Sequence, residues 1–115
     1  MTTKRPQWKW RWWHRAALAP LVLALHSAQA AEPAPDAVKL TRLVRQDCGS
    51  CHGLTMNGGL GKPLTADRLQ QWNAAELALI ILDGVPGTPM PPWRPLMSEA
   101  EARWIAETLR QGSLQ

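Results

Sequence analysis

Two cysteines and a histidine form one short string in this 115-residue chain, Cys48-Gly49-Ser50-Cys51-His52. On a helical turn, residues three positions apart face the same way, and the next residue lies beside them. Two thiols on one face can each form a thioether with a vinyl group of a haem, and the histidine is then carried beneath the iron. The string therefore predicts one covalently attached haem c, with Cys48 and Cys51 as its thioethers and His52 as the proximal iron ligand.

Three other kinds of site use cysteines at this spacing. Zinc needs four nitrogen or sulfur ligands, or three with a water. The chain after residue 30 supplies only the three ligands of the string, so zinc would require a second chain. A thioredoxin-like redox pair expects a βαβ frame, which the sequence does not show, and a disulfide across so short a span would stabilise little. Haem attachment is the interpretation favoured here, and these three are its alternatives.

The opposite face of the iron needs its own ligand, and methionines are the candidates. Beyond residue 30 there is no second histidine, and the methionines are Met56, Met90 and Met97. Met56 follows His52 too closely to reach the opposite face. Met97 directly precedes Ser98, where an apolar residue usually packs against the start of a helix. Met90 lies between prolines that hold an extended loop and present its sulfur with little ordering. We expect Met90 as the second axial ligand, with Met97 or an open or water-ligated iron as alternatives.

Ligation by a histidine and a methionine has a functional consequence. Six-coordinate iron has no open position for oxygen or peroxide, and a soft thioether favours Fe(II) and raises the reduction potential. The expected activity is outer-sphere transfer of single electrons, by a carrier and not by an enzyme. Trp93 and Arg94 lie near the predicted ligand in the sequence. One interpretation is that both hydrogen-bond a haem propionate. The other is that Trp93 packs on the haem edge and Arg94 is solvated.

Charge is distributed unevenly along the chain. The formal net charge is +4, but the first 30 residues contain no acidic side chain and hold five of the thirteen basic ones. The rest of the chain carries eight basic and nine acidic residues, a net charge of −1. A globular part without a strongly basic face does not bind nucleic acid. About 85 residues make one small domain at most, which excludes a multidomain enzyme.

The first 30 residues have the order of an export signal. A basic segment ending at Arg15 precedes the apolar run 16–25, and Ala28-Gln29-Ala30 gives a small-x-small cleavage pattern. We expect residues 1–30 to be a signal peptide that is removed and residues 31–115 to be a mono-haem domain in the periplasm. The alternative is a retained membrane anchor. The apolar run, however, covers only about half of a ~30 Å hydrocarbon core, and a proline interrupts it.

Caps and periodicity predict helices and no strands. We expect a helix over 37–47 capped by Asp36, a short turn or helix over 65–72 capped by Thr65, a helix over 74–83, and a last helix over 99–110. Two capping boxes support the later helices, Asn73 with Glu76 and Ser98 with Glu101. The expected inward-facing residues are Ala37, Leu40, Val44, Leu77, Ile80, Ile81, Trp104, Ile105, Thr108 and Leu109. The predicted fold class is all-α, with about four helices around one haem.

Two irregular segments connect the helices. Residues 53–63 form a Gly-rich loop, but Met56 and Pro63 stand where a phosphate-binding loop requires glycine and serine or threonine. Nucleotide binding is therefore excluded, and the loop is expected to let backbone pass close to the proximal face of the haem. Residues 85–95 are rich in proline, which fixes φ and removes backbone donors.

Residues 36–111 resemble a class I cytochrome c, through the helix ending in the Cys-x-x-Cys-His string, the Gly-rich loop, the Met-Pro loop and the final helix. More narrowly, Asp47-Cys-Gly-Ser-Cys-His-Gly53 together with Gly87-Thr-Pro-Met-Pro-Pro-Trp93 resembles the small periplasmic mono-haem cytochromes found with cytochrome cd-type nitrite reductase. The resemblance implies a part in denitrification, as an electron donor to the reductase or as an electron acceptor during maturation of its d-type haem. A gas-binding protein with five-coordinate haem is the third possibility.

The resemblance also bears on partners. The chain after residue 30 has only two lysines, Lys39 and Lys62, whereas some mitochondrial-type cytochromes surround the haem edge with lysines. We therefore expect mostly apolar docking to redox proteins, with rates that depend weakly on salt. The protein is expected to be a monomer without a nucleic-acid partner or a stable membrane anchor.

Overall fold

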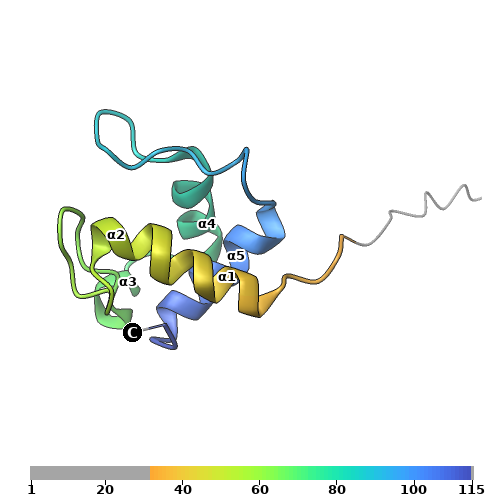
Figure 1. Ribbon diagram of the computed structural model, residues 1–115, viewed down its shortest axis with the longest axis horizontal. Coiled ribbons are helices and arrows are strands. Elements are labelled where there is room, and N and C mark those ends of the chain that lie inside the picture. Colours follow the sequence, from red (N-terminus) through yellow and green to blue (C-terminus); the bar gives the residue numbers. More distant parts are fainter. Residues whose placement is uncertain (1–31, 115) are drawn as a thin grey trace, which may run out of the picture. The chain divides into compact units, whose positions relative to one another are not determined.

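All regular elements in the part of the chain that the structure describes, residues 32–114, are helical (Figure 1). This computed structural model confirms the predicted all-α class, with about four helical units. The predicted signal peptide lies outside the described residues. Between residues 32 and 114, no helix combines the length and the apolar character needed to cross a bilayer.

The first helical unit continues further than predicted. α1 (Ala37–Leu43), the π-helical turn η2 (Val44–Cys48) and α2 (Gly49–His52) follow one another without a break. Asp36 caps the unit as expected, accepting the backbone N–H groups of Val38 at 3.0 Å and Lys39 at 3.1 Å. The expected end near residue 47 is wrong, because the backbone of Gly49 is itself helical and the helix stops only at Gly53. The attachment string is therefore helical throughout.

α3 (Ala66–Leu69) and α4 (Ala74–Asp83) follow the Gly-rich loop. Thr65 is the residue before α3, but its side chain makes no capping hydrogen bond, so the expected cap is absent. α4 has the predicted bounds and the predicted capping box, in which Asn73 and Glu76 each accept the backbone N–H of the other. Local sequence thus determines the start of α4 accurately.

α5 (Glu99–Arg110) also has the predicted bounds. Ser98 and Glu101 form the reciprocal capping box. At the other end, the N–H groups of Gly112 and Ser113 bond to the carbonyls of Leu109 and Thr108 at 3.0 and 3.2 Å. This is the paired arrangement of a Schellman motif with glycine in the left-handed conformation.

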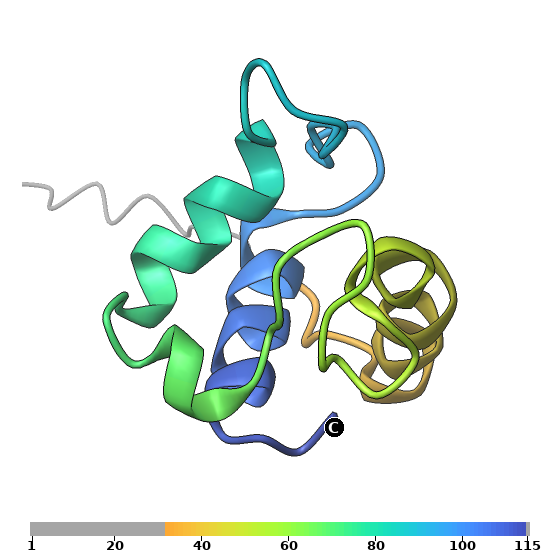
Figure 2. The ribbon, with the colours of Figure 1, turned by 90° about the vertical axis from the view of Figure 1, so that its left-hand side faces the viewer.

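The core forms where α1, α4 and α5 meet, and Figure 2 shows α4 and α5 packed along each other. The buried hydrophobic residues of the helices are Leu40, Val44, Leu69, Leu77, Ala78, Leu82, Ala102, Ile105, Ala106 and Leu109. The predicted inward position of Ala37 is wrong, because this residue is exposed. Ile80, Ile81 and Trp104 are half-buried but pack against the core as predicted, and Thr108 is half-buried. Two fully buried alanines explain the shift on α5, because small side chains occupy the places where helices approach closely.

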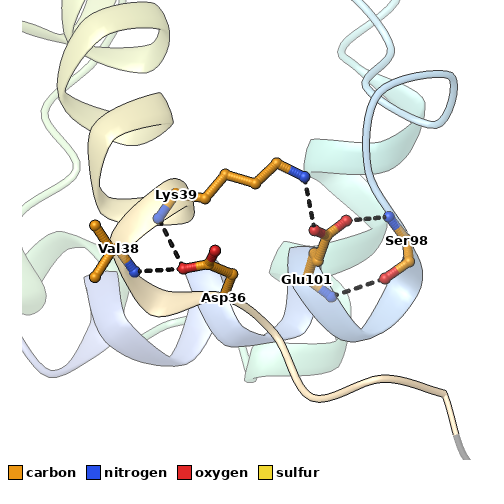
Figure 3. Close-up of polar contacts among 5 residues, drawn as sticks. All are labelled: Asp36, Val38, Lys39, Ser98 and Glu101. Carbon is orange, nitrogen blue, oxygen red and sulfur yellow. Dashed lines mark hydrogen bonds and ion pairs between the residues drawn. The ribbon is translucent and has the colours of Figure 1, made fainter.

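Glu101 connects the first helical unit to α5 (Figure 3). One carboxylate oxygen accepts the N–H of Ser98 at 2.8 Å, and the other accepts Lys39 Nζ at 3.3 Å. The hydrogen bond from Ser98, and secondarily Lys39, holds the pKa of Glu101 below its ordinary value. The start of α5 and the start of α1 are therefore tied through one carboxylate.

Candidate haem site

The attachment string lies on one continuous stretch of helix. Cys48 ends η2, and Cys51 and His52 form the last turn of α2. Both cysteines are free thiols and half-buried. Between the two cysteines, only Ser50 has a side chain. Its hydroxyl donates a hydrogen bond to the Asp47 carbonyl at 2.6 Å. The disulfide alternative does not describe this structure, in which two unpaired sulfurs are available for thioether bonds.

The Cys48 thiol is chemically quiet. Burial, and secondarily the charge of Asp47, raises its pKa to about 11. A thioredoxin-like pair needs the opposite, a cysteine whose pKa is lowered so that thiolate is present at neutral pH. The environment of Cys48 therefore argues against a thiol–disulfide exchange centre.

The ring orientation of His52 leaves one nitrogen available for a metal. His52 Nδ1 lies 2.6 Å from the backbone carbonyl oxygen of Lys62. A carbonyl only accepts hydrogen bonds, so Nδ1 carries the proton and Nε2 of the neutral ring has a free lone pair. Metal-ligating histidines are commonly oriented in this way by a carbonyl partner. The imidazole is thus already in the tautomer that a metal ligand requires.

The Gly-rich loop folds back on the end of α2. The N–H groups of Gly58 and Gly61 donate to the carbonyls of His52 and Cys51, at 2.7 and 2.8 Å. A Cβ on Gly61 would lie 2.8 Å from both Cε1 and Nδ1 of His52. Only a residue without a side chain fits against the face of this ring, so the loop backbone lies directly against the imidazole.

The three methionines after residue 30 occupy different environments. Met56 is fully buried and has a left-handed backbone with φ 57°, and its side chain packs beside Gly49. Met97 belongs to the core next to the Ser98 cap, as expected of a residue that packs at a helix start. Met90 lies outside the core cluster, on the segment between α4 and α5, and is half-exposed. Both core methionines have packing roles that Met90 lacks.

Backbone contacts fix the segment that carries Met90, which Figures 1 and 2 show arching away from α4 and α5. The carbonyl of Leu82 accepts the N–H groups of Trp93 and Arg94 at 2.9 and 3.2 Å. Gly84 allows the same segment to approach the end of α4, since a Cβ there would lie 2.7 Å from the Met90 carbonyl oxygen. The segment is therefore hydrogen-bonded to α4 just after Met90 and lies against Gly84 at Met90 itself.

Arg94 has carboxylate partners in this structure. Its Nε donates to Asp83 at 2.6 Å and its Nη1 to Glu99 at 3.5 Å. These contacts raise the pKa of Arg94, chiefly through the hydrogen bond to Asp83. Neither earlier interpretation included these partners. The guanidinium links the end of α4 to the start of α5. Trp93 is half-buried and packs against the core.

The donor set fits a haem c better than a bare metal ion. Two free thiols, an imidazole with an available Nε2 and a thioether outside the core match two vinyl groups and two axial positions. Among residues 32–114, no cluster of three or more histidine, cysteine, aspartate or glutamate side chains is arranged to hold a metal ion. Zinc, which needs such a cluster, does not match the described residues.

An all-α fold with a helical Cys-x-x-Cys-His string is the arrangement expected of a small c-type cytochrome. A family profile described as cytochrome C oxidase, cbb3-type, subunit III matches residues 35–107, and the chain belongs to this family. Cytochrome c55X of Paracoccus denitrificans (strain Pd 1222) is 55% identical over 97 residues, which cover 82% of this chain and 93% of that protein.

Two solved structures are also similar. The c-type cytochrome NirC superposes with a TM-score of 0.67 at 44% identity, covering 70% of this chain and 98% of that one. Dihydro-heme d1 dehydrogenase NirN in complex with DHE matches with a TM-score of 0.57 at 33% identity, covering 61% of this chain and 15% of that one.

These likenesses confirm the predicted class. The chain is a c-type cytochrome, an electron carrier and not an enzyme, and its family implies covalently bound haem c. The similarity to cytochrome c55X and to NirC also confirms the narrower resemblance, to the small cytochrome associated with nitrite reductase.

Sequence reasoning did not single out three contributors to the site, although it expected the Gly-rich loop to bring backbone close. The Lys62 carbonyl orients His52, but a main-chain atom leaves no mark in residue type. Gly61 and Gly84 make the close approaches, and the density of glycine around residue 60 and the helix-ending glycine after Asp83 were their only signals.

Proposed function

We propose that the chain transfers single electrons through one haem c, bound covalently by Cys48 and Cys51 and ligated by His52 and Met90. The observation that carries the proposal is the placement of the methionines. Met56 and Met97 are buried in the core, whereas Met90 lies on a separate segment outside it. Such a sulfur is available to complete a six-coordinate iron.

The haem, when bound, supplies an iron that alternates between Fe(II) and Fe(III). The residues of the chain supply the rest. The Lys62 carbonyl holds His52 in one tautomer and orientation. A methionine thioether favours the reduced state and occupies the position that oxygen or carbon monoxide would need. The expected outcome is a carrier with a raised potential that does not bind gases.

Replacement of Met90 tests the ligation. Met90→Ala is expected to lose the far-red sulfur-to-iron(III) charge-transfer band and to bind carbon monoxide in the reduced state. The matched control is Met97→Leu, a volume-conserving change in the core that should cost less than about 1.5 kcal/mol and keep the band. If Met90→Ala binds carbon monoxide no more readily than the unmodified protein, the ligand assignment is wrong and an open or Met97-ligated iron takes its place.

Covalent attachment is tested separately. Acid-acetone treatment should leave the colour with the protein, because thioether bonds to Cys48 and Cys51 survive denaturation. A colourless protein, or pigment that is extracted into the solvent, would contradict the proposal for both cysteines.

We further propose that residues 1–30 are a signal peptide and that the mature domain, 31–115, works in the periplasm. The support is the order of basic, apolar and small-x-small segments. The mass of the protein isolated from a periplasmic extract should correspond to a chain beginning at Ala31. A full-length chain recovered with membranes would instead support a retained anchor.

The redox partner is proposed to be cytochrome cd-type nitrite reductase, so that the chain acts in denitrification. Likeness to cytochrome c55X and to NirC supports this choice. The alternative is an accessory electron acceptor during maturation of the d-type haem. It draws support from likeness to the dihydro-heme d1 dehydrogenase NirN. Deleting the gene separates them: loss of nitrite reduction with normal d-haem content supports the donor, whereas loss of d-haem supports the maturation role.

Docking is expected to be mostly apolar. Of the two lysines after residue 30, Lys39 pairs with Glu101. Lys62 is exposed and has no acidic partner among the described residues. Rates of electron transfer to the reductase should change little between low and physiological salt. A steep fall with ionic strength would contradict this expectation without affecting the haem ligation.

A further inference from the structure

We propose that Thr88 is a positioning residue that shapes the loop presenting the Met90 sulfur. The inference rests on the proposed ligation by Met90 and adds a residue that does not itself touch the iron. Thr88 stands two positions before Met90, and Pro89 lies between them.

The Thr88 hydroxyl bridges the two ends of the loop. Its Oγ1 donates to the Val85 carbonyl at 2.7 Å and accepts the Met90 N–H at 3.3 Å. Backbone bonds complete the closure: the Thr88 N–H donates to Val85 O at 3.1 Å, and the Val85 N–H donates to Met90 O at 3.2 Å. One hydroxyl therefore connects the start of the loop to the backbone of the proposed ligand.

Side-chain packing does not hold the loop from Val85 to Pro89 in place of these hydrogen bonds. Every residue from Val85 to Pro89 is exposed, and a side chain added at Gly87 would meet nothing within 4 Å. Pro86 and Pro89 have no backbone N–H, so they cannot donate alternative hydrogen bonds. The prolines fix φ only at their own positions, so closure of the loop between Val85 and Met90 depends on a few hydrogen bonds. Those of the Thr88 hydroxyl are the only side-chain bonds that the structure records within 85–90.

Removing the hydroxyl should weaken sulfur ligation without unfolding the protein. An exposed hydrogen bond contributes little to global stability, but a loop that samples more conformations presents the ligand in the right place less often. An external ligand such as imidazole then competes better for the iron. The expected effect of Thr88→Val is an about fivefold tighter apparent affinity of the oxidised protein for imidazole.

The experiment uses the haem-loaded protein and three variants. Thr88→Val keeps the shape of the side chain and removes the hydroxyl, and Thr88→Ser restores it. Thr108→Val is the matched control, because its hydroxyl also donates to a backbone carbonyl, that of Trp104, at 2.7 Å, but within α5. Imidazole titrations of the oxidised protein, together with the far-red sulfur-to-iron band, provide readouts that a purely structural role would not change.

Thr88→Val should bind imidazole more tightly and lose band intensity, Thr88→Ser should resemble the unmodified protein, and Thr108→Val should alter neither readout. Equal imidazole affinities for Thr88→Val and Thr108→Val would overturn the proposal, as would a Thr88→Ser variant that behaves like Thr88→Val. Met90→Ala distinguishes a wrong role for Thr88 from a wrong ligand assignment. If Met90→Ala binds carbon monoxide and the unmodified protein does not, Met90 remains the ligand and only the role of Thr88 is rejected.

Discussion

Replacing Gly84 with alanine is expected to displace the Met90 segment, because no side chain fits between that segment and the end of α4. Gly84 has φ 66° and ψ −170°, a conformation that residues with a side chain adopt at a cost of about 1–3 kcal/mol. A Cβ here would lie 2.6 Å from the carbonyl carbon of Pro91. Carbon atoms in contact are normally about 3.5–4.0 Å apart, so the Pro91 backbone would have to move by about 1 Å.

Backbone strain and the displaced contact together predict that Gly84→Ala lowers the free energy of unfolding by about 3 kcal/mol. Gly87 offers a matched control. It also has positive φ, 76°, but an added Cβ would meet nothing within 4 Å. Gly87→Ala should therefore cost only the left-handed penalty of about 1–2 kcal/mol. The variants share backbone strain and differ in the collision with the Met90 segment.

Urea unfolding of the haem-loaded variants measures the stability difference, and the far-red sulfur-to-iron band reports whether Met90 remains bound. Gly84→Ala should lose more stability and part of the band, whereas Gly87→Ala should keep the band. If both variants keep the full band and unfold at the same urea concentration, the close approach at Gly84 does not position Met90.

Three further outcomes follow from the geometry. Gly61→Ala should destabilise the holoprotein by about 2 kcal/mol, because its Cβ would lie 2.8 Å from the His52 ring. The control Gly49→Ala, whose Cβ would make ordinary contacts from 3.5 Å, should be neutral or stabilising. Urea unfolding measures both. Ser98→Ala should cost about 1 kcal/mol through the lost cap, measured likewise. The pKa of Glu101 is lowered on folding. Its contribution to the free energy of unfolding is therefore complete above its pKa in the unfolded chain and disappears as pH falls. Between about pH 5 and pH 3, the free energy of unfolding should drop less in Glu101→Gln than in the unmodified protein.

Local signals in the sequence predicted local structure well. The bounds of α4 and α5 agree with the expectation because each helix begins at a reciprocal capping box, whose residues are three apart and identifiable by type. The Cys48–His52 string is a local signal of the same kind, because its two cysteines and histidine lie within five consecutive residues. Their attachment to haem stays a prediction.

Features that depend on tertiary contact were not accessible from the sequence. The pairing of Arg94 with Asp83 and Glu99 joins residues from two helices, and nothing in their spacing selects those partners. The buried face of α5 includes Ala102 and Ala106, whose small side chains give a weak hydrophobic signal but fit where helices come close. The Lys62 carbonyl acts on His52 through an atom that every residue possesses.

The wide turn η2 makes the number of residues before Cys48 as important as their identity. The Gly49 N–H reaches back five positions to the Val44 carbonyl, one more than in an α-helix, so the turn absorbs one additional residue. Each residue of a regular α-helix advances the chain by about 100° around its axis. Deleting one residue from this turn would give a more regular helix. It would also turn both sulfurs and the imidazole by about 100° around the helix axis, relative to the buried face of α1. Here an irregularity in the winding sets the direction in which the two thiols and the imidazole face.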